Sequence, residues 1–209
     1  MSKAVMISIR PKWCEKICDG EKTVEVRKTR PKLEMPFKCY IYCTAERVGY
    51  EELWVLDAPS REKYLITAVC AYLQRAEGAS KGNRKVIGEF ICDRIYELET
   101  KAPGGSYYVK GEDQPTTNDV ARQSCLTLKD MHEYLQAKVG YGWHISALKI
   151  YDKPKELIEF HTWKKCKSCS KSGYESTACI YDENCMIPAA ITKAPQSWCY
   201  VEEVARWND

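Results

Sequence analysis

The stretch Gly20–Arg27 constrains the fold most strongly, because a helix must end there and a strand must begin. Upstream of it, Pro11 suits the first turn of a helix, and Trp13 and Ile17 lie four residues apart on one helical face. Gly20 suits the left-handed position that closes a helix. We therefore predict a helix over residues 11–19 that leads directly into a strand.

The residues after this glycine alternate with a period of two, which is typical of a β-strand. Val24 and Val26 share one face, whereas the other face carries Thr23, Glu25 and Arg27. The sequence thus predicts a strand over residues 23–28 with one core face and one polar face. Function is expected on the polar face, and the alternative interpretation of the same residues is a surface ion network.

The order of these features resembles the ASCH family. The resemblance rests on Ser8, Ile9, Pro11 and Trp13, followed by the motif Gly20-x-Lys22-x-x-Glu25-x-Arg27. It implies an α+β fold, a PUA-like mixed β-barrel with peripheral helices. It also implies binding of RNA or a modified nucleotide and, in some members, RNA cleavage or amide hydrolysis on acylated cytidines.

Length and charge favour a single domain over residues 1–209 with an anionic partner. The net charge is only +3, but residues 1–50 hold 11 Lys or Arg against 6 Asp or Glu. Because cations contact phosphates, a basic segment around the motif favours RNA. The apolar run 4–9 is too short for a signal peptide, and no run approaches the roughly 18 residues of a membrane helix. We therefore expect a cytoplasmic protein that does not enter membranes.

Lys22 is the strongest single candidate for chemistry. In a binding module, Lys22 and Arg27 contact phosphate or a base edge while Glu25 orients them. In an amidohydrolase acting on N4-acylated cytidine, Lys22 activates a nucleophile and a carboxylate such as Glu25 moves the proton. The amidohydrolase relatives place a threonine where this chain has Glu25, which leaves Thr23 as the substitute hydroxyl. A ribonuclease is the other enzymatic alternative.

A second group of candidates opens a strand predicted over residues 140–150. Trp143 could stack on a base, and His144 could hydrogen-bond to one. Because side chains alternate along a strand, His144 and Ser146 share a face and Trp143 points to the other. We expect His144 and Ser146 to lie opposite Lys22 in an RNA-binding cleft. The alternative is a core tryptophan and a structural histidine.

The twelve cysteines divide into two groups. Seven lie in apolar stretches and are expected in the core, where a free thiol behaves as a small hydrophobe: Cys14, Cys18, Cys39, Cys43, Cys70, Cys92 and Cys125. A structural zinc site in a Cys-rich insert over residues 160–190 is predicted from Cys166, Cys169, Cys179 and Cys185. His161 or Cys199 could replace one ligand, and an Fe–S cluster or unligated thiols are the alternatives.

The Cys-rich insert also supports a third functional interpretation, in which it docks a protein partner and the barrel is only a scaffold. Further patterns predict strands over residues 5–9, 38–44, 85–98 and 196–203, with the insert between two strands of one barrel. A helix, or alternatively a strand, is predicted over 60–74, a helix is predicted after Thr127, and Gly88 predicts a bulge or a close backbone approach.

Overall fold

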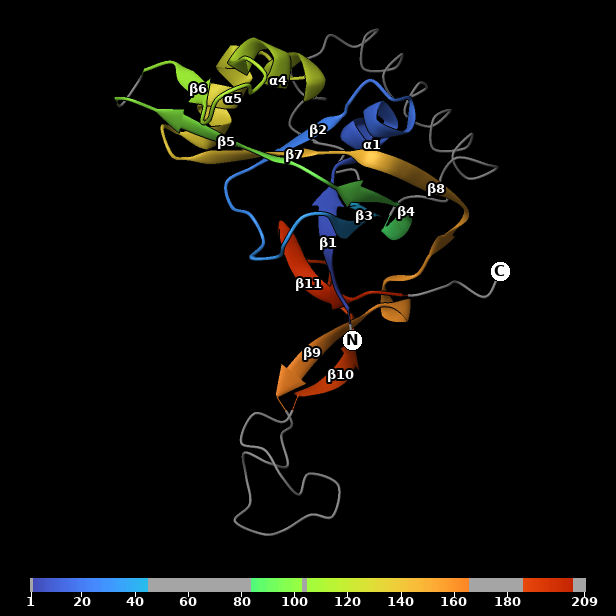
Figure 1. Cartoon of the computed structure of the whole chain (residues 1–209). Coiled ribbons are helices and arrows are strands. Elements are labelled where there is room, and N and C mark those ends of the chain that lie inside the picture. Colours follow the sequence, from blue (N-terminus) through green and yellow to red (C-terminus); the bar gives the residue numbers. More distant parts are fainter. Residues whose placement is uncertain (1, 45–83, 103–104, 166–185, 205–209) are drawn as a thin grey trace, which may run out of the picture.

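The computed structural model describes residues 2–44, 84–102, 105–165 and 186–204. These residues form a mixed α+β fold made mainly of strands (Figure 1). The larger sheet has the order β11-β1-β3-β4-β8, with β1 (Lys3–Ile9), β3 (Phe37–Cys43), β4 (Lys85–Cys92), β8 (Ser146–Lys155) and β11 (Trp198–Glu202). The smaller sheet has the order β2-β7-β5-β6, with β2 (Val24–Arg27), β5 (Ile95–Thr100), β6 (Tyr107–Val109) and β7 (Gly140–His144).

Two long segments, residues 85–100 and 140–155, run through both sheets and join them. The sequence predicted one strand in each segment, but each is broken, at residues 93–94 and at residue 145. β4 and β8 pair in the larger sheet, whereas β5 and β7 pair in the smaller one. The two breaks lie side by side, because the His144 amide donates to the Arg94 carbonyl at 3.0 Å. The paired segments therefore leave one sheet and enter the other together.

A closed barrel, which the family resemblance implied, is not found among the described residues. Their strands instead form separate sheets of five and four strands, connected through the two crossing segments. The Gly88 prediction is confirmed: the register against β8 shifts beside it, and an added Cβ would lie 2.5 Å from the Lys149 carbonyl oxygen. A side chain at this position would therefore force the two strands apart.

A third, two-stranded sheet is formed by the two ends of the range 160–190 in which the Cys-rich insert was predicted. It pairs β9 (His161–Lys165) with β10 (Met186–Ala190) and follows the short 3₁₀ helix η3 (Leu157–Glu159). The middle of this range, residues 166–185, lies outside the described residues, as does the segment 60–74. No helix in the described part of the chain has the length and apolar character needed to span a membrane.

Helix α1 (Pro11–Cys18) forms as the sequence predicted. Pro11 occupies its first turn, Cys14 and Ile17 are its buried residues, and Gly20 follows it with a φ of +75°. Glycine adopts this left-handed conformation without the steric cost that a Cβ would impose. The helix therefore ends where β2 must begin, and the motif lysine lies in the short connection between them.

Helices α4 (Thr117–Gln123) and α5 (Leu128–Leu135) cover one face of β2. Each begins with a capping box, formed by Thr116 with Asp119 and by Thr127 with Asp130. Their apolar residues pack with Val24 and Val26 in one buried cluster: Val120, Ala121, Met131 and Leu135. The valine face of β2 is core, as predicted, and this packing leaves the charged face of β2 directed between the two sheets.

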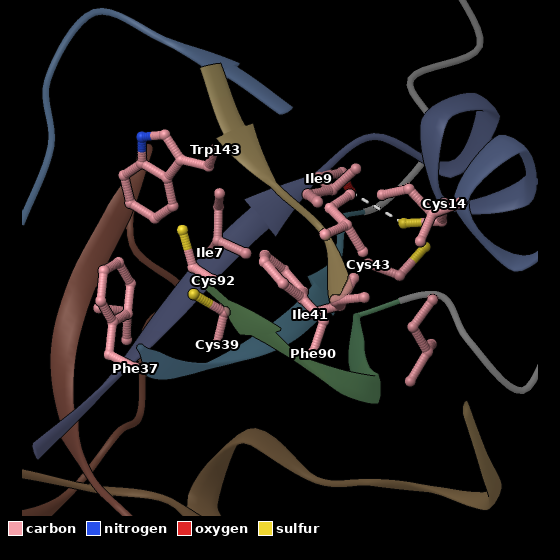
Figure 2. Close-up of a cluster of buried hydrophobic side chains, with 14 residues drawn as sticks. Ile7, Ile9, Cys14, Phe37, Cys39, Ile41, Cys43, Phe90, Cys92 and Trp143 are labelled. Atoms are coloured by element: carbon pink, nitrogen blue, oxygen red, sulfur yellow. Dashed lines mark hydrogen bonds between the residues drawn. The ribbon is translucent and has the colours of Figure 1, made fainter. Parts of the chain in front are cut away.

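The main core lies between the two sheets and α1 (Figure 2). It contains four of the cysteines predicted to be core residues: Cys14, Cys39, Cys43 and Cys92. Cys18 is exposed, so its prediction was wrong, while Cys125 is half-buried and Cys70 lies outside the described residues. Burial raises the pKa of the Cys92 thiol to about 12. It is therefore protonated at neutral pH and behaves as a small apolar side chain.

Candidate functional site

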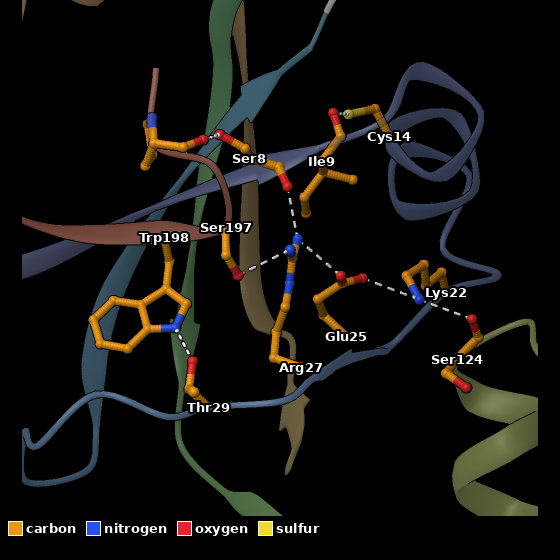
Figure 3. A network of polar contacts seen from close by, with 11 residues as sticks. Ser8, Ile9, Cys14, Lys22, Glu25, Arg27, Thr29, Ser124, Ser197 and Trp198 are labelled. Atoms are coloured by element: carbon orange, nitrogen blue, oxygen red, sulfur yellow. Dashed lines mark hydrogen bonds and ion pairs between the residues drawn. The ribbon is translucent and has the colours of Figure 1, made fainter. Parts of the chain in front are cut away.

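The three charged residues of the motif form one network at the edge of the smaller sheet (Figure 3). Lys22 Nζ lies 3.1 Å from Glu25 Oε2, and Arg27 Nη2 lies 3.0 Å from Glu25 Oε1. A single carboxylate therefore bridges two cations, one through each oxygen. We refer to Lys22, Glu25 and Arg27 as the triad.

Backbone groups from distant parts of the chain fix both cations. Lys22 Nζ donates to the Ser124 carbonyl, just after α4, at 2.8 Å. Arg27 Nη2 donates to the Ser8 carbonyl in β1 at 2.7 Å, and Nη1 lies 3.4 Å from Ser197 Oγ, just before β11. Ser8 belongs to the motif on which the family resemblance rests. The structure gives it a physical role, because its carbonyl holds the guanidinium in place.

The triad is buried, unlike either arrangement considered from the sequence. Lys22, Glu25 and Arg27 are only 3%, 7% and 9% exposed, so they form neither a surface ion network nor an open polar face. Two cations share one anion, which leaves a net positive charge beneath the surface. Among the residues that the structure describes, Arg27 Nε has no hydrogen-bond partner. Burying charge and leaving a donor unused are both costly, which marks this site as unusual.

Exposed basic side chains surround the triad. Lys12 lies on α1, and Lys28 and Arg30 follow Arg27 directly in the chain. Lys12 Nζ and Lys22 Nζ approach the Trp13 ring, at 4.5 Å and 5.2 Å from its centroid. The basic N-terminal segment seen in the sequence therefore places exposed cations around the buried triad.

The pairing of β2 with β7 decides where the second group of candidates lies. Glu25 is paired with Trp143, whereas Val24 is paired with His144. Because paired residues point to the same face, Trp143 lies on the triad's side and His144 on the opposite side. The prediction that His144 and Ser146 lie opposite Lys22 is therefore wrong. Trp143 is fully buried and packs edge-to-face on Phe37, as a core tryptophan does.

His144 and Ser146 instead meet at Asp93, a residue that the sequence analysis missed. His144 Nδ1 lies 2.6 Å from Asp93 Oδ1, and Ser146 Oγ donates to the Ile91 carbonyl at 2.8 Å. Burial tends to raise the pKa of Asp93, but the hydrogen bond from His144 and the backbone amide of Asp93 outweigh it, so the net pKa is lowered. This contact spans the point where both long segments cross between the sheets. The available signal was the polar pair 93–94 inside an otherwise apolar strand.

A cavity of about 560 Å³ lies apart from the triad, between β6 and the first turns of α4 and α5. Its walls include Tyr107, Thr117 and His132. Thr117 Oγ1 already donates to the Tyr107 carbonyl at 2.8 Å, and the His132 ring packs edge-on against the Tyr107 ring. Since these polar groups have partners within the protein, the triad is the stronger candidate site.

The four predicted zinc ligands, Cys166, Cys169, Cys179 and Cys185, lie outside the described residues. Within the described residues, no group of three or more His, Cys, Asp or Glu side chains could hold a metal ion. The zinc site stays a prediction. Metal analysis of protein purified without added zinc tests it: about one equivalent is expected for a four-cysteine site, and less than about half an equivalent would contradict it.

No family model and no curated protein matches the sequence. The chain is similar in structure to the ASCH protein of Zymomonas mobilis, with 14% identity, 96% of this chain and 88% of that chain covered, and a TM-score of 0.47. A mutant of that protein gives 14% identity, coverage of 97% and 92%, and a TM-score of 0.47. Both of these solved structures are ASCH proteins.

Proposed function

We propose that the chain recognises RNA or a modified nucleotide at the triad and the basic residues around it. The observation that carries this proposal is the incomplete charge balance of the triad. One carboxylate faces two cations, and Arg27 Nε has no partner among the described residues. The excess positive charge beneath the surface would attract an anionic group, or a carbonyl on a base edge.

The buried cations of the triad and the exposed cations around it have different roles. The triad charges are fixed by Ser8, Ser124 and their own carboxylate, so they supply a constant positive field with little cost of ordering. The exposed Lys28 and Arg30 can move to meet phosphates, as side chains of this kind do in RNA complexes. Phosphate contacts are therefore assigned to the exposed residues, and the triad is assigned the role of orienting the bound group.

The dependence of binding on salt tests this division. We expect the wild-type protein to bind a labelled RNA oligonucleotide with an affinity that falls as salt rises. Lys28→Ala and Arg30→Ala should each reduce the slope of log K against log salt by about 1, because one phosphate contact is lost. Lys101→Ala is the matched control, since this exposed lysine lies just beyond β5, away from the triad. Equal slopes in all four proteins would refute phosphate contacts at this site.

A second candidate function is hydrolysis of an N4-acylated cytidine, and one contact favours it. Lys22 Nζ and Glu25 Oε2 are 3.1 Å apart in a buried setting, which is within reach for proton transfer between them. Incubation with N4-acetylcytidine, followed by chromatography of released cytidine, tests this function. Multiple turnover by the wild type that Lys22→Met abolishes, with folding retained, would support an enzyme. Absence of turnover in the wild type would leave RNA recognition as the function.

A further inference from the structure

Three aromatic rings near the triad are each contacted by a basic side chain from residues 12–30. The Trp13 ring faces Lys12 and Lys22, as described above. Lys28 Nζ lies 5.1 Å from the centroid of the Tyr134 ring, and Arg30 Cζ lies 5.8 Å from that of Tyr141. Aromatic rings interleaved with mobile cations are the combination that binds single-stranded nucleic acids, because bases stack on the rings while cations meet phosphates.

The rings come from separate elements but lie around one site. Tyr141 in β7 is the cross-strand partner of Arg27, so their side chains emerge on the same face of the smaller sheet. Tyr134 lies on α5, close enough for the charges of the triad to act on the Tyr134 hydroxyl. Burial raises the pKa of Tyr134, Arg27 opposes this rise and Glu25 adds to it. Trp13, on α1, contacts Lys22 itself.

We propose that Trp13, Tyr134 and Tyr141 form a stacking surface for the unpaired bases of single-stranded RNA. This proposal rests on the proposed function and specifies its substrate class. Tyr134 is 40% exposed, whereas Trp13 and Tyr141 are half-buried and pack against the main core, which fixes their rings. A base stacked on a ring is worth more than an exposed cation–π contact, so a base can displace or share the cation.

Single-stranded RNA fits this surface better than a duplex. In a duplex the faces of the bases are covered by their neighbours, and a protein meets mainly phosphates and sugars. The exposed cations would bind both forms of RNA, but the rings gain contacts only with the single strand. The stacking surface therefore predicts a preference for unpaired RNA that charge alone would not give.

Binding of a fluorescein-labelled oligouridine of about 12 nucleotides, compared with an RNA duplex of the same length, tests the proposal. Tyr134→Ala should weaken binding of the single strand roughly 5- to 150-fold, the range for loss of one base stack, and leave the salt slope unchanged. Tyr134→Phe keeps the ring and should bind like the wild type. The duplex should bind more weakly than the single strand and respond little to Tyr134→Ala.

The chain offers a matched control in Tyr108. This tyrosine is 36% exposed and has Lys101 Nζ 5.7 Å from its ring centroid. It lies on β6, at the other edge of the sheet from β2, and three strand spacings separate β6 from β2 by about 14 Å. Tyr108→Ala should leave RNA binding unchanged. Equal affinities of Tyr134→Ala and Tyr108→Ala, or equal wild-type affinities for single strand and duplex, would overturn the stacking surface.

These outcomes separate the two proposals. If binding depends on Lys28 and Arg30 through salt but not on Tyr134, RNA recognition stands and the stacking surface is refuted. If the wild type binds neither RNA probe, the proposed function fails, and the stacking surface fails with it. Thermal melts of each variant confirm that a change in binding does not come from unfolding.

Discussion

The carboxylates of Glu25 and Asp93 both meet a basic side chain, yet they occupy opposite surroundings. The Glu25 side chain is 9% exposed and contacts two cations, whereas the Asp93 side chain is 35% exposed and contacts one histidine. They lie beside neighbouring positions of β7, because Glu25 is paired with Trp143 and Asp93 contacts His144. A shift of one position along β7 thus separates the buried triad from the partly exposed contact between Asp93 and His144.

The contrast shows how exposure to water changes the contribution of a charged contact to stability. Water still screens Asp93, so its contact with His144 adds little stability and its loss costs little. Around Glu25 little water remains, and the protein itself must supply every partner. Burying charges as around Glu25 costs free energy. The triad is therefore the better indicator of function, and the Asp93–His144 contact is the better indicator of fold.

Removal of the shared anion should have the largest effect. Glu25→Ala leaves Lys22 and Arg27 as unpaired buried cations that repel each other, and should lower the free energy of unfolding by about 3–5 kcal/mol. Denaturant titration followed by circular dichroism measures this loss. Asp93→Ala is the matched comparison, with an expected loss of about 1 kcal/mol or less. Equal losses in the two variants would contradict the contrast between the two sites.

Removal of one cation should have an intermediate effect. Lys22→Met keeps the length of the side chain, and Glu25 retains its contact with Arg27 at 3.0 Å. The remaining penalty is that the Ser124 carbonyl and Glu25 Oε2 lose their donor, which should cost about 1–3 kcal/mol. The same titration measures it. A loss as large as that of Glu25→Ala would mean that Lys22, and not the shared carboxylate, dominates the network.

The smallest effect is expected from the pH dependence at Asp93. Because the folded-state pKa of Asp93 is lowered, its charge stabilises the fold above the ordinary value of 3.8, and this stabilisation is lost as pH falls through the lower folded-state pKa. The difference in unfolding free energy between wild type and Asp93→Asn should be about 1 kcal/mol or less at neutral pH and vanish in acid. A difference that grows as pH falls would reverse the sign and refute the assignment.

Local signals in the sequence predicted much of the fold. Pro11 and Gly20 mark the two ends of α1, and Thr127 marks the start of α5, because each acts through its immediate neighbours. The strands β1, β3 and β11 follow from runs of apolar residues. Helix α4 was missed, although Thr116 and Asp119 have the spacing of a capping box.

The breaks in the two crossing segments and the arrangement of the site could not be predicted in this way. Asp93 and Arg94 interrupt the apolar pattern of their segment, but Ile145 is typical of strand interiors, and the two breaks lie together because two sheets are joined at that place. The motif indicated that Lys22, Glu25 and Arg27 belong together. The face taken by His144 depends on its register with Val24, more than a hundred residues away, which no local pattern encodes.

The contacts of Arg27 also carry a consequence for how the protein is made. Ser197 lies 170 residues after Arg27, and β11 pairs with β1 beside it. A nascent chain on the ribosome therefore has β1 and the triad long before the strand that completes their surroundings, and such distant pairings form late in folding. The guanidinium acquires its full set of partners only when residues 195–202 emerge.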